Sequence, residues 1–565
     1  MQITAISDID GQCSRRGADI LLEILESEGV KYIFGNPGTT ELPLIDALQK
    51  RPDLQYVLAL QEASAVAMAD GYAQAAGRPG FLNLHTAGGL GHGMGNLLNA
   101  SVSQTPLVVT AGQQDSRHTI SDPLLFGDLV SIATPAVKWA QEVMHADQLP
   151  VLVHRAFNDA MAAPTGPVFL SLPMDVMEEM STVSAAPPSR IERCSIAGGL
   201  PELARHLAQI APGRLGIIAG DEVHAAGAAA QVAAVAELLG APVFGSSWPS
   251  RVPFATSHPL WEGNLPTRAT DIAAKLGDYD AIFALGGKSL ITILYSEGSA
   301  VPPGCAIYQV SADIGDLGRT FYTPLSLVGH IRASLEAFLP LLAKEIEGRQ
   351  DVYASAREKV TARNRDRRNA ALSIARHRME DPVIAPCVAA YEAVRAIGPD
   401  IAIVDEAIAT SSHVRSFLNS DWPAQYSFLR GGALGWGMPA AVGASLGLGR
   451  EPVVCLVGDG ASLYSPQAIW TAAHEKLPVT FVIMNNQEYN VLKGFMRGQT
   501  HYVSTRNGNY LAMDLNDPVI DYQAMATSYG LSACRITRAT DIAAAIQAGI
   551  TSGRANVVEI MIRAE

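Results

Sequence analysis

The sequence predicts an α/β protein made of three doubly wound domains, each built on a parallel sheet. Its 565 residues exceed what one hydrophobic core supports, and three domains of roughly 180 residues are the natural expectation. Short apolar, β-branched runs alternate with helical segments along the chain, which is typical of parallel sheets covered by helices. Apolar residues make up 48% of the chain and charged residues only 17%, so a largely disordered protein is excluded.

The first block is expected to form a domain over residues 1–184. Apolar runs and helical periodicity predict strands over 30–34, 54–60, 80–84 and 107–111, and helices over 17–29 and 63–76. Strands that alternate with helices imply crossover connections, so this block predicts a parallel, doubly wound sheet.

Two further α/β blocks follow the proline-containing linker over residues 185–189. The second, over 190–343, is expected to hold strands over 215–219, 281–285 and 305–310, and an alanine-rich helix over 225–239. Residues 344–381 are highly charged and predict a solvated helical connector that includes the basic run 363–368. The third block, over 382–565, begins with a helix and a strand over 401–404.

Charge and cysteine usage exclude several classes of partner. The net charge of −14 argues against nucleic acid and anionic membranes as partners. No uninterrupted apolar stretch approaches the length of a membrane span, and the segment after Arg15-Arg16 is too charged for a secretory signal. The six cysteines show no CxxC or metal-ligand spacing, so we expect free thiols and a cytoplasmic protein.

Polar residues follow two neighbouring predicted strands of the third block. Gly458-Asp459-Gly460 comes directly after the strand over 453–457, and Asn485-Asn486 follows the strand over 479–484. The carboxyl ends of parallel strands meet at one sheet edge, where open α/β sheets bind ligands. A carboxylate, an amide oxygen and a close backbone approach at glycine predict a hard-cation site beside a diphosphate. Alone, the Gly-Asp-Gly triplet would more often be an ordinary turn.

Together these two motifs resemble the cofactor motif of the thiamine-diphosphate (ThDP)-dependent enzymes. The three blocks resemble their pyrimidine-binding, central and diphosphate-binding domains over nearly the whole chain. The resemblance implies ThDP and Mg²⁺ as cofactors, with Asp459, Asn486 and the carbonyl of Glu488 as metal ligands. It also places a set of small residues around the cofactor: Gly432, Gly458, Gly460, Ala461 and Ser462.

Glu62 is the expected catalytic carboxylate of the first block. In ThDP enzymes a glutamate at the end of a strand shares a proton with the cofactor's aminopyrimidine ring. The segments Ala59–Ala63 and Ala69–Ala73 match the family pattern around that glutamate. The alternative is a glutamate that merely interacts with a helix dipole.

Three loops of the first block are similar to those of benzoylformate decarboxylases: 34–43, 83–88 and 108–114. The resemblance implies that Thr39 replaces a serine that contacts the substrate carboxylate, and that His85 is a catalytic proton carrier. In the third block, segment 431–439 matches the family loop that bends the cofactor, with Leu434 as the bulky wedge.

The sequence also departs from the benzoylformate decarboxylase pattern. Ile293 stands where that family has a second histidine, and neither His413 nor His501 is assigned to replace it. Val491 and Phe495 are expected in the substrate pocket, while nearby Lys493 is expected at the surface.

The resemblance implies a ThDP- and Mg²⁺-dependent lyase that decarboxylates a benzoylformate-like 2-oxo acid to an aldehyde through a C2-carbanion and enamine. The alternative is a carboligase or lyase similar to acetolactate synthase or 2-hydroxyacyl-CoA lyase. Because Glu62 and the metal motif lie in different domains, the family pattern implies a homodimer at minimum and a homotetramer as the usual assembly. Whether the central domain binds a nucleotide stays open.

Overall fold

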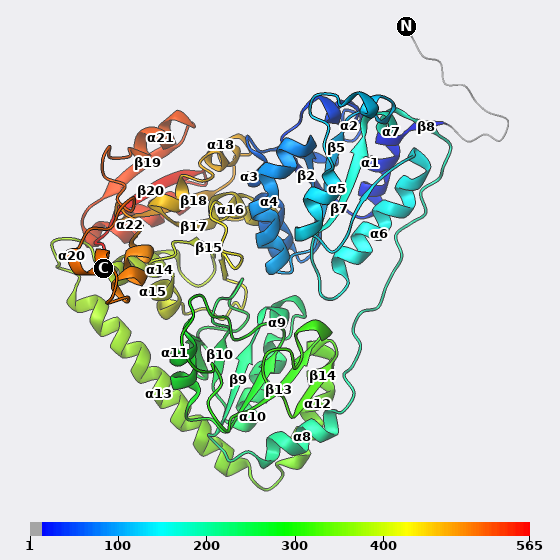
Figure 1. Ribbon diagram of the computed structural model, residues 1–565. Helices are drawn as coiled ribbons and strands as arrows, with labels where there is room; N and C mark the ends of the chain where they lie inside the picture. The colour runs from blue at the N-terminus through cyan, green and yellow to red at the C-terminus, as the bar shows by residue number, and fades with distance from the viewer. Residues whose placement is uncertain (1–13) are drawn as a thin grey trace.

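The computed structural model describes residues 14–565, which form three lobes, each built on a six-stranded parallel sheet (Figure 1). The N-terminal and C-terminal lobes lie side by side, and the central lobe lies below them in Figure 1. Helices flank every sheet, so the predicted fold class is confirmed.

The N-terminal sheet has the strand order β3-β2-β4-β5-β7-β6. Its strands are β2 (Tyr32–Gly35), β3 (Gln55–Leu58), β4 (Gly80–His85), β5 (Leu107–Gln113), β6 (Ala140–Glu142) and β7 (Val168–Pro173). Its helices are α1 (Gly17–Ser27), α2 (Leu42–Leu48), α3 (Glu62–Ala76), α4 (Thr86–Val102), α5 (Leu129–Ala133), α6 (Leu149–Met161) and α7 (Met174–Glu178). A short antiparallel pair, β1 (Arg15–Arg16) with β8 (Met180–Ser181), brings the two ends of this lobe together.

The central sheet has the order β11-β10-β9-β12-β13-β14. Its strands are β9 (Leu215–Ala219), β10 (Val243–Gly245), β11 (Trp261–Asn264), β12 (Ala281–Leu285), β13 (Ala306–Ser311) and β14 (Leu325–Val328). Its helices are α8 (Leu200–Gln209), α9 (Asp221–Ala225), α10 (Ala229–Leu239), α11 (Ala269–Leu276) and α12 (Ile331–Glu345). The helix predicted around 225–239 is present but begins later, at Ala229, because Gly227 adopts a φ of +60° and separates α10 from the short α9.

The C-terminal sheet has the order β16-β15-β17-β18-β20-β19. Its strands are β15 (Ala402–Glu406), β16 (Tyr426–Phe428), β17 (Val453–Gly458), β18 (Val479–Asn485), β19 (Ser532–Ile536) and β20 (Asn556–Met561). Its helices are α14 (Pro386–Ile397), α15 (Ser411–Phe417), α16 (Gly437–Gly447), α17 (Asp459–Ser462), α18 (Gln467–His474), α19 (Asn490–Arg497), α20 (Val503–Asn507), α21 (Tyr522–Ser528) and α22 (Ala539–Thr551).

The N-terminal and C-terminal sheets share one topology, since their strand orders become identical when β2 is matched to β15 and each later strand to its counterpart. In this match α3 corresponds to α16, and these two helices pack against each other between the lobes (Figure 1). Glycine makes the close approach possible. A Cβ at Gly443 of α16 would overlap the carbonyl oxygen of Met68, and one at Gly71 of α3 would overlap the carbonyl oxygen of Ala440.

The connector forms the long helix α13 (Gln350–His377), which runs along the edge of the molecule from the central to the C-terminal lobe (Figure 1). The prediction of a solvated basic run is wrong in part. Arg363 and Arg367 form ion pairs with Glu262, a central-lobe carboxylate that is 4% exposed. Asn364 is buried and donates a hydrogen bond to the Pro259 carbonyl. The buried carboxylate thus docks the connector on the central lobe.

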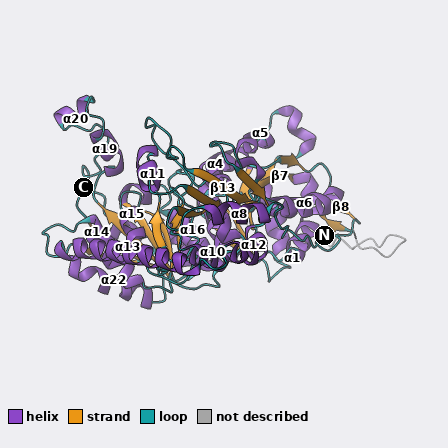
Figure 2. Ribbon diagram, turned by 90° about the horizontal axis from the view of Figure 1, so that it is seen from below, coloured by secondary structure: helices purple, strands orange, loops and turns teal. Residues whose placement is uncertain are grey.

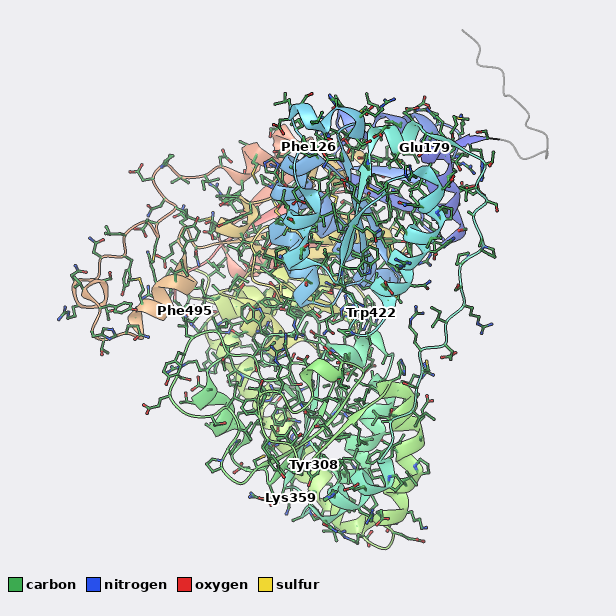
Figure 3. The ribbon with its side chains drawn as sticks, turned by 45° about the vertical axis from the view of Figure 1, so that its right-hand side comes forward. Phe126, Glu179, Tyr308, Lys359, Trp422 and Phe495 are labelled. Carbon is green, nitrogen blue, oxygen red and sulfur yellow. The ribbon has the colours of Figure 1, made fainter. Side chains whose placement is uncertain are left out.

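Helices α19 and α20 project from the body of the C-terminal lobe (Figure 2). Figure 3 shows the chain extending outward beyond Phe495, which is 36% exposed. Among residues 14–565, no helix is long and apolar enough to cross a membrane. The five cysteines in this range are free thiols, and Cys13 lies outside the described residues.

Candidate active site

Asp459 lies where β17 ends and α17 begins, at the carboxyl edge of the C-terminal sheet. Its Oδ1 accepts a hydrogen bond from the Gly460 amide at 2.8 Å, and its Oδ2 accepts one from the Gln487 amide at 2.6 Å. Burial raises the pKa of Asp459 to about 6, although backbone N–H groups around it act in the opposite direction. The carboxylate therefore connects the turn after β17 to the turn after β18, the two segments that the sequence paired.

The turn after β18 is a left-handed bend at Gln487, whose φ is +59°. Asn486 precedes the bend, and its side-chain oxygen accepts a hydrogen bond from the Glu488 amide at 3.1 Å. Asp459 and the 486–488 turn thus lie together, as the sequence predicted. Within the described part of the chain no group of three His, Cys, Asp or Glu side chains could hold a metal, so a cation here would need amide and carbonyl oxygens.

Small residues follow Asp459 in the chain. Gly460 faces the ring of Tyr489, which a Cβ at position 460 would overlap. Ala461 and Ser462 are buried in α17, and the Ser462 hydroxyl donates to the Asp459 carbonyl at 2.7 Å. A backbone turn lined by such small side chains can be approached closely by a phosphate group.

Lys493 is buried, which corrects the prediction of a surface lysine. Its side chain is 8% exposed; its ammonium donates to the Glu488 carboxylate and lies 2.5 Å from the Asp514 carboxylate. Because Glu488 follows Asn486 by two residues, this ion-pair network connects the turn over 486–488 to helix α19. The sequence carried no sign of it, since Asp514 lies 21 residues away.

The loop that carries Leu434 is held from two sides. Glu406, at the end of β15, accepts hydrogen bonds from the backbone amides of Gly435, Trp436 and Gly437 at 2.7, 3.2 and 2.7 Å. From α4 of the N-terminal lobe, Asn99 donates to the Ala433 carbonyl and accepts from the Ala433 amide. Leu434 is half-buried between these anchors, and Gly432 is exposed with a φ of +82°. Glu406 and Asn99 are functional candidates that sequence reasoning missed.

Glu62 begins helix α3, whose N-cap Gln61 accepts a hydrogen bond from the Ser64 amide. The two carboxylate oxygens of Glu62 contact different partners. Oε1 accepts from the Asn36 side-chain amide at 3.3 Å, and Oε2 lies 3.2 Å from Nδ1 of His92 on α4. Gly89 lies directly against the Glu62 side chain, so a larger residue there would crowd the carboxylate.

His85, at the end of β4, is held by a carboxylate that the sequence did not point to. Nδ1 of His85 lies 2.8 Å from Oε2 of Glu41, which also accepts from the Gly38 amide. Oε1 of Glu41 accepts from the Thr40 hydroxyl and the Gly112 amide. Both oxygens of Glu41 accept from backbone amides, so we assign the carboxylate as the acceptor and Nδ1 of His85 as the donor. This leaves Nε2 of His85 for a substrate.

The hydrogen bond to Glu41 raises the pKa of His85, and burial acts against this. Thr40, not Thr39, contacts the histidine, with its hydroxyl 3.1 Å from Nδ1. Thr39 is exposed at the start of the 3₁₀ turn over Thr39–Glu41. Glu41 is the third residue of that turn and accepts from the Gly38 amide, a local contact that sequence can suggest, whereas its contact with His85 spans 44 residues and could not be predicted.

Within one chain the predicted site residues fall into two groups, one in the N-terminal lobe and one in the C-terminal lobe. Among the described residues, no hydrogen bond or ion pair joins Glu62 or His85 to Asp459 or Asn486. The expected pocket residues are also apart. Val491 is half-buried and Phe495 exposed on α19, while Ile293 lies 43% exposed on a central-lobe loop, its amide bonded to the Thr267 carbonyl.

The two unassigned histidines both belong to the C-terminal lobe. His413, on α15, is half-buried, and burial lowers its pKa while Glu565 acts against that shift. His501 is exposed between α19 and α20 and packs edge-on against Tyr502. Among the described residues neither forms a hydrogen bond with another predicted site residue.

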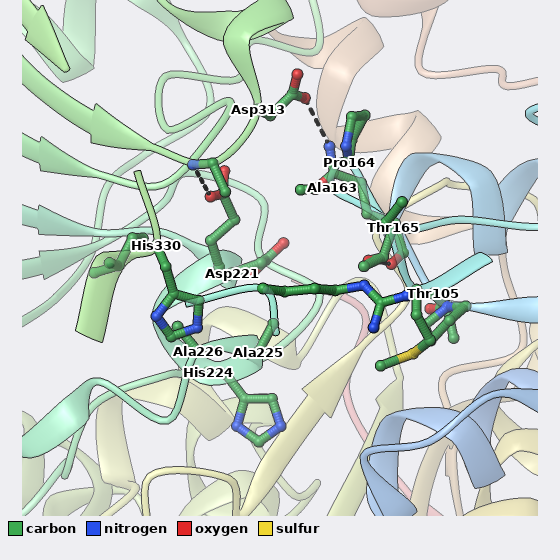
Figure 4. A pocket seen from close by; sticks show the side chains of 18 of the residues that line it. Thr105, Ala163, Pro164, Thr165, Asp221, His224, Ala225, Ala226, Asp313 and His330 are labelled. Carbon is green, nitrogen blue, oxygen red and sulfur yellow. Dashed lines mark hydrogen bonds between the residues drawn. The ribbon is translucent and has the colours of Figure 1, made fainter. Parts of the chain in front are cut away.

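A cavity of about 680 Å³ lies elsewhere, between the N-terminal and central lobes (Figure 4). Asp221, His224 and His330 line it from the carboxyl end of the central sheet, and Thr105 and Thr165 line it from the N-terminal lobe. None of the predicted site residues faces it. The predicted catalytic and metal-binding residues therefore lie outside this cavity. We take those residues, Glu62 with His85 and Asp459 with Asn486, as the candidate active site.

Three family models match the chain in the order of its lobes. The "Thiamine pyrophosphate enzyme, N-terminal TPP binding domain" matches residues 15–144. The "Thiamine pyrophosphate enzyme, central domain" matches residues 205–338, and the "Thiamine pyrophosphate enzyme, C-terminal TPP binding domain" matches residues 410–560.

Full-length relatives and solved structures agree with these matches. Benzoylformate decarboxylase of Pseudomonas aeruginosa is 31% identical over 95% of this chain and 97% of its own. Acetolactate synthase isozyme 3 large subunit of Escherichia coli is 25% identical over 96% of this chain and 93% of its own. The thiamine-diphosphate-dependent 4-hydroxybenzoylformate decarboxylase of Rhodococcus jostii has a TM-score of 0.85 at 28% identity, covering 98% of this chain and 100% of its own.

Proposed function

Because this chain belongs to the thiamine-diphosphate-dependent enzymes and is close to the benzoylformate decarboxylases, we propose that it decarboxylates a benzoylformate-like 2-oxo acid to an aldehyde. The observation that carries the proposal is His85 held through Nδ1 by buried Glu41, in the same lobe as Glu62. A protein that only bound the cofactor would not need an oriented acid–base group.

We infer that Mg²⁺ and the diphosphate bind at the turns after β17 and β18. The donor set of Asp459, Asn486 and the Glu488 carbonyl is entirely oxygen, which suits Mg²⁺. Two observations support the fit: the left-handed backbone at Gln487, and the absence of a side chain at Gly460, where a Cβ would overlap Tyr489. Leu434, fixed by its loop anchors, would support the bent shape of the cofactor.

When bound, ThDP supplies the electron sink for decarboxylation. The chain's own residues would then hold and move protons. Glu62 would share a proton with the ring nitrogen of the cofactor's aminopyrimidine, and His85 would carry a proton at Nε2. Glu41 fixes the tautomer that leaves Nε2 available, and the exposed Thr39 hydroxyl would bind the substrate carboxylate.

A carboligase is the second candidate, and one observation favours it. Ile293 provides no proton donor where the benzoylformate decarboxylase pattern has a histidine, and among the described residues neither His413 nor His501 forms a hydrogen bond with another predicted site residue. A site with one proton carrier fewer would favour adding a second carbonyl compound over rapid release of an aldehyde. The similarity to acetolactate synthases supports the same alternative.

We propose that the working unit is at least a homodimer, assembled as a homotetramer, in which Glu62 and His85 of one chain meet Asp459 and Asn486 of the other. Their location in different lobes, with no hydrogen bond or ion pair between the two pairs among the described residues, supports this. Large apolar side chains are also exposed on both lobes, including Ile120 at 93% and Leu124 at 85%, and a second chain would cover them.

A substrate panel tests the proposal. The protein, supplied with ThDP and Mg²⁺, would be incubated with single 2-oxo acids, first alone and then with aldehyde acceptors. Aldehyde and CO₂ from an aromatic 2-oxo acid without an acceptor are expected. Turnover that requires an acceptor or an acyl-CoA would favour the carboligase. A Glu62→Gln variant with full activity would overturn the catalytic assignment.

A further inference from the structure

We propose that Arg430 and Asp221 form a positioning pair through which the central lobe holds the loop of Leu434, and with it the bent shape of the cofactor. The inference rests on the proposed role of that loop in binding ThDP. It assigns a part in the chemistry to the central lobe, which carries none of the catalytic or metal-binding residues proposed above.

Arg430 directly precedes the loop and is buried against the central lobe. Its side chain is 8% exposed, and its guanidinium forms an ion pair with Asp221, whose side chain is 16% exposed. The guanidinium also donates to the Lys288 carbonyl at 3.3 Å. Asp221 begins α9 just after β9, and Lys288 lies in the turn after β12. Arg430 therefore binds at the carboxyl ends of two neighbouring strands of the central sheet.

Asp221 also holds the central-lobe segment that lies beside strand β16 of the C-terminal lobe. Its two carboxylate oxygens share the Ser250 amide, at 3.2 Å each. The Phe428 amide donates to the Ser250 carbonyl at 2.7 Å, and Nε1 of Trp248 donates to the Leu429 carbonyl at 3.0 Å. The same carboxylate thus holds both this segment and the arginine that follows β16 in the chain.

Each of the three lobes supports the loop at a different point. Asn99 of the N-terminal lobe binds its middle, Glu406 of the C-terminal lobe binds its end, and Arg430 ties its beginning to the central lobe. The two residues after Arg430 are glycines, and Gly432 has a φ of +82°. Because glycine restricts the backbone least, the anchor before these glycines helps to set where Leu434 lies.

The ion pair has no substitute in the part of the chain that the structure describes, since neither Arg430 nor Asp221 has a second ion-pair partner there. Removing one partner of a buried pair leaves the other charge uncompensated, so the remaining side chain would turn toward water and release its contacts. A shift of Leu434 by about 1 Å would then misplace the group that it supports, and a misplacement of this size can slow a positioned reaction by about 10²-fold.

Exchange of the C2 hydrogen of bound ThDP for deuterium tests this without turnover. It would be measured by acid quench and NMR, without substrate and at saturating ThDP and Mg²⁺. The bent shape brings the cofactor's amino group to C2, so the exchange rate reports that shape. We expect Arg430→Met, which keeps an apolar stem but no charge, to slow the exchange roughly tenfold. Arg430→Lys keeps the charge and should recover part of the rate.

Two further variants separate the pair from general stability. Asp221→Asn keeps an acceptor for the Ser250 amide and should also slow the exchange. The double variant should be no slower than the slower single variant, as expected of two residues that act as one pair. Arg363→Met is the matched control, because it breaks an ion pair with another buried central-lobe carboxylate, Glu262. It should leave the exchange rate unchanged even where it lowers stability.

Exchange as fast as wild type in both Arg430→Met and Asp221→Asn would overturn the inference, and so would an equal loss in Arg363→Met. If Arg430→Met does not fold, Asp221→Asn decides alone. Loss of ThDP binding in the folded pair variants, with Arg363→Met unaffected, would support the inference as well. Failure of the proposed function would look different, because wild type would then not bind ThDP in calorimetry, or its bound ThDP would exchange no faster than free ThDP.

Discussion

Replacing Glu406 by glutamine tests whether this buried carboxylate is held charged at the expense of stability. Glu406 is 1% exposed and accepts three backbone hydrogen bonds, from Gly435, Trp436 and Gly437. Burial raises its pKa from the ordinary 4.5 to about 7, with the three amides acting in the opposite direction. At 1.36 kcal/mol per pH unit, ionising it inside the fold costs about 3 kcal/mol relative to the unfolded chain.

The sign follows from proton binding. Between pH 4.5 and 7 the folded protein holds the Glu406 proton more tightly than the unfolded chain, so the free energy of unfolding falls as pH rises through this window. Glutamine removes that dependence. The side-chain amide nitrogen of the glutamine would replace one carboxylate oxygen and would face at least one backbone N–H. The least costly arrangement places it against Gly437 alone, and leaving that one donor unpaired costs about 1–3 kcal/mol. We expect Glu406→Gln to be less stable than wild type by about 2 kcal/mol at pH 5 and about equal or slightly more stable at pH 8.

Urea unfolding of both proteins without cofactor, at steps of half a pH unit from pH 5 to 8, gives the urea midpoint of each. The difference in midpoint, multiplied by the shared slope m, is the difference in free energy of unfolding. Glu358→Gln, at an exposed position of α13, is the control and should differ from wild type by a constant amount. If the difference between wild type and Glu406→Gln stays constant with pH or grows as pH rises, the assignment of a charged, desolvated Glu406 is wrong.

Two further predictions concern assembly and packing. We expect the Glu62→Gln and Asp459→Asn chains to be inactive alone and to regain about a quarter of wild-type activity after mixing and subunit exchange. The reason is that half of the dimers are then mixed, and each mixed dimer carries one intact site out of two. A mixture that stays inactive, although native mass spectrometry shows subunit exchange, would exclude a shared site. Gly443→Ala should lower the midpoint temperature of thermal unfolding by several degrees, because its Cβ would overlap the Met68 carbonyl. Gly494→Ala, with open space around it in α19, should leave that temperature unchanged or raise it. Equal midpoint temperatures for the two variants would count against the close helix crossing.

The sequence predicted most of the fold because its buried strands are apolar throughout. The runs over 215–219 and 281–285 coincide with β9 and β12, since a parallel strand covered on both faces has no polar residue to blur its ends. The helix predicted around 225–239 starts four residues later, at Ala229, because periodicity does not reveal the left-handed backbone of Gly227. The basic run in α13 failed because its partner, Glu262, lies about 100 residues earlier in the chain.

The candidate site divides in the same way. Asp459 and Asn486 could be paired from sequence because both follow strands at one sheet edge. Glu41, Glu406 and Lys493 could not, because each acts through contacts formed only in the folded chain. Glu41 reaches His85 across 44 residues, and Glu406 reaches the Leu434 loop across about 30. Supporting groups of this kind carry no motif of their own.

The N-terminal and C-terminal sheets repeat one topology within the chain, and the groups of the proposed site are divided between the two copies. In the proposed site, one copy of the fold carries Glu62 and His85 as proton-handling groups, and the other carries the oxygen ligands and the loop of Leu434. Helix α3 starts at Glu62, and α16 starts three residues after Leu434. In the proposed dimer these ends belong to two different active centres, yet the helices cross against each other at Gly71 and Gly443 within one chain. A tilt at that crossing would move a carboxylate in one centre and the cofactor wedge in the other, so the two centres would be mechanically coupled.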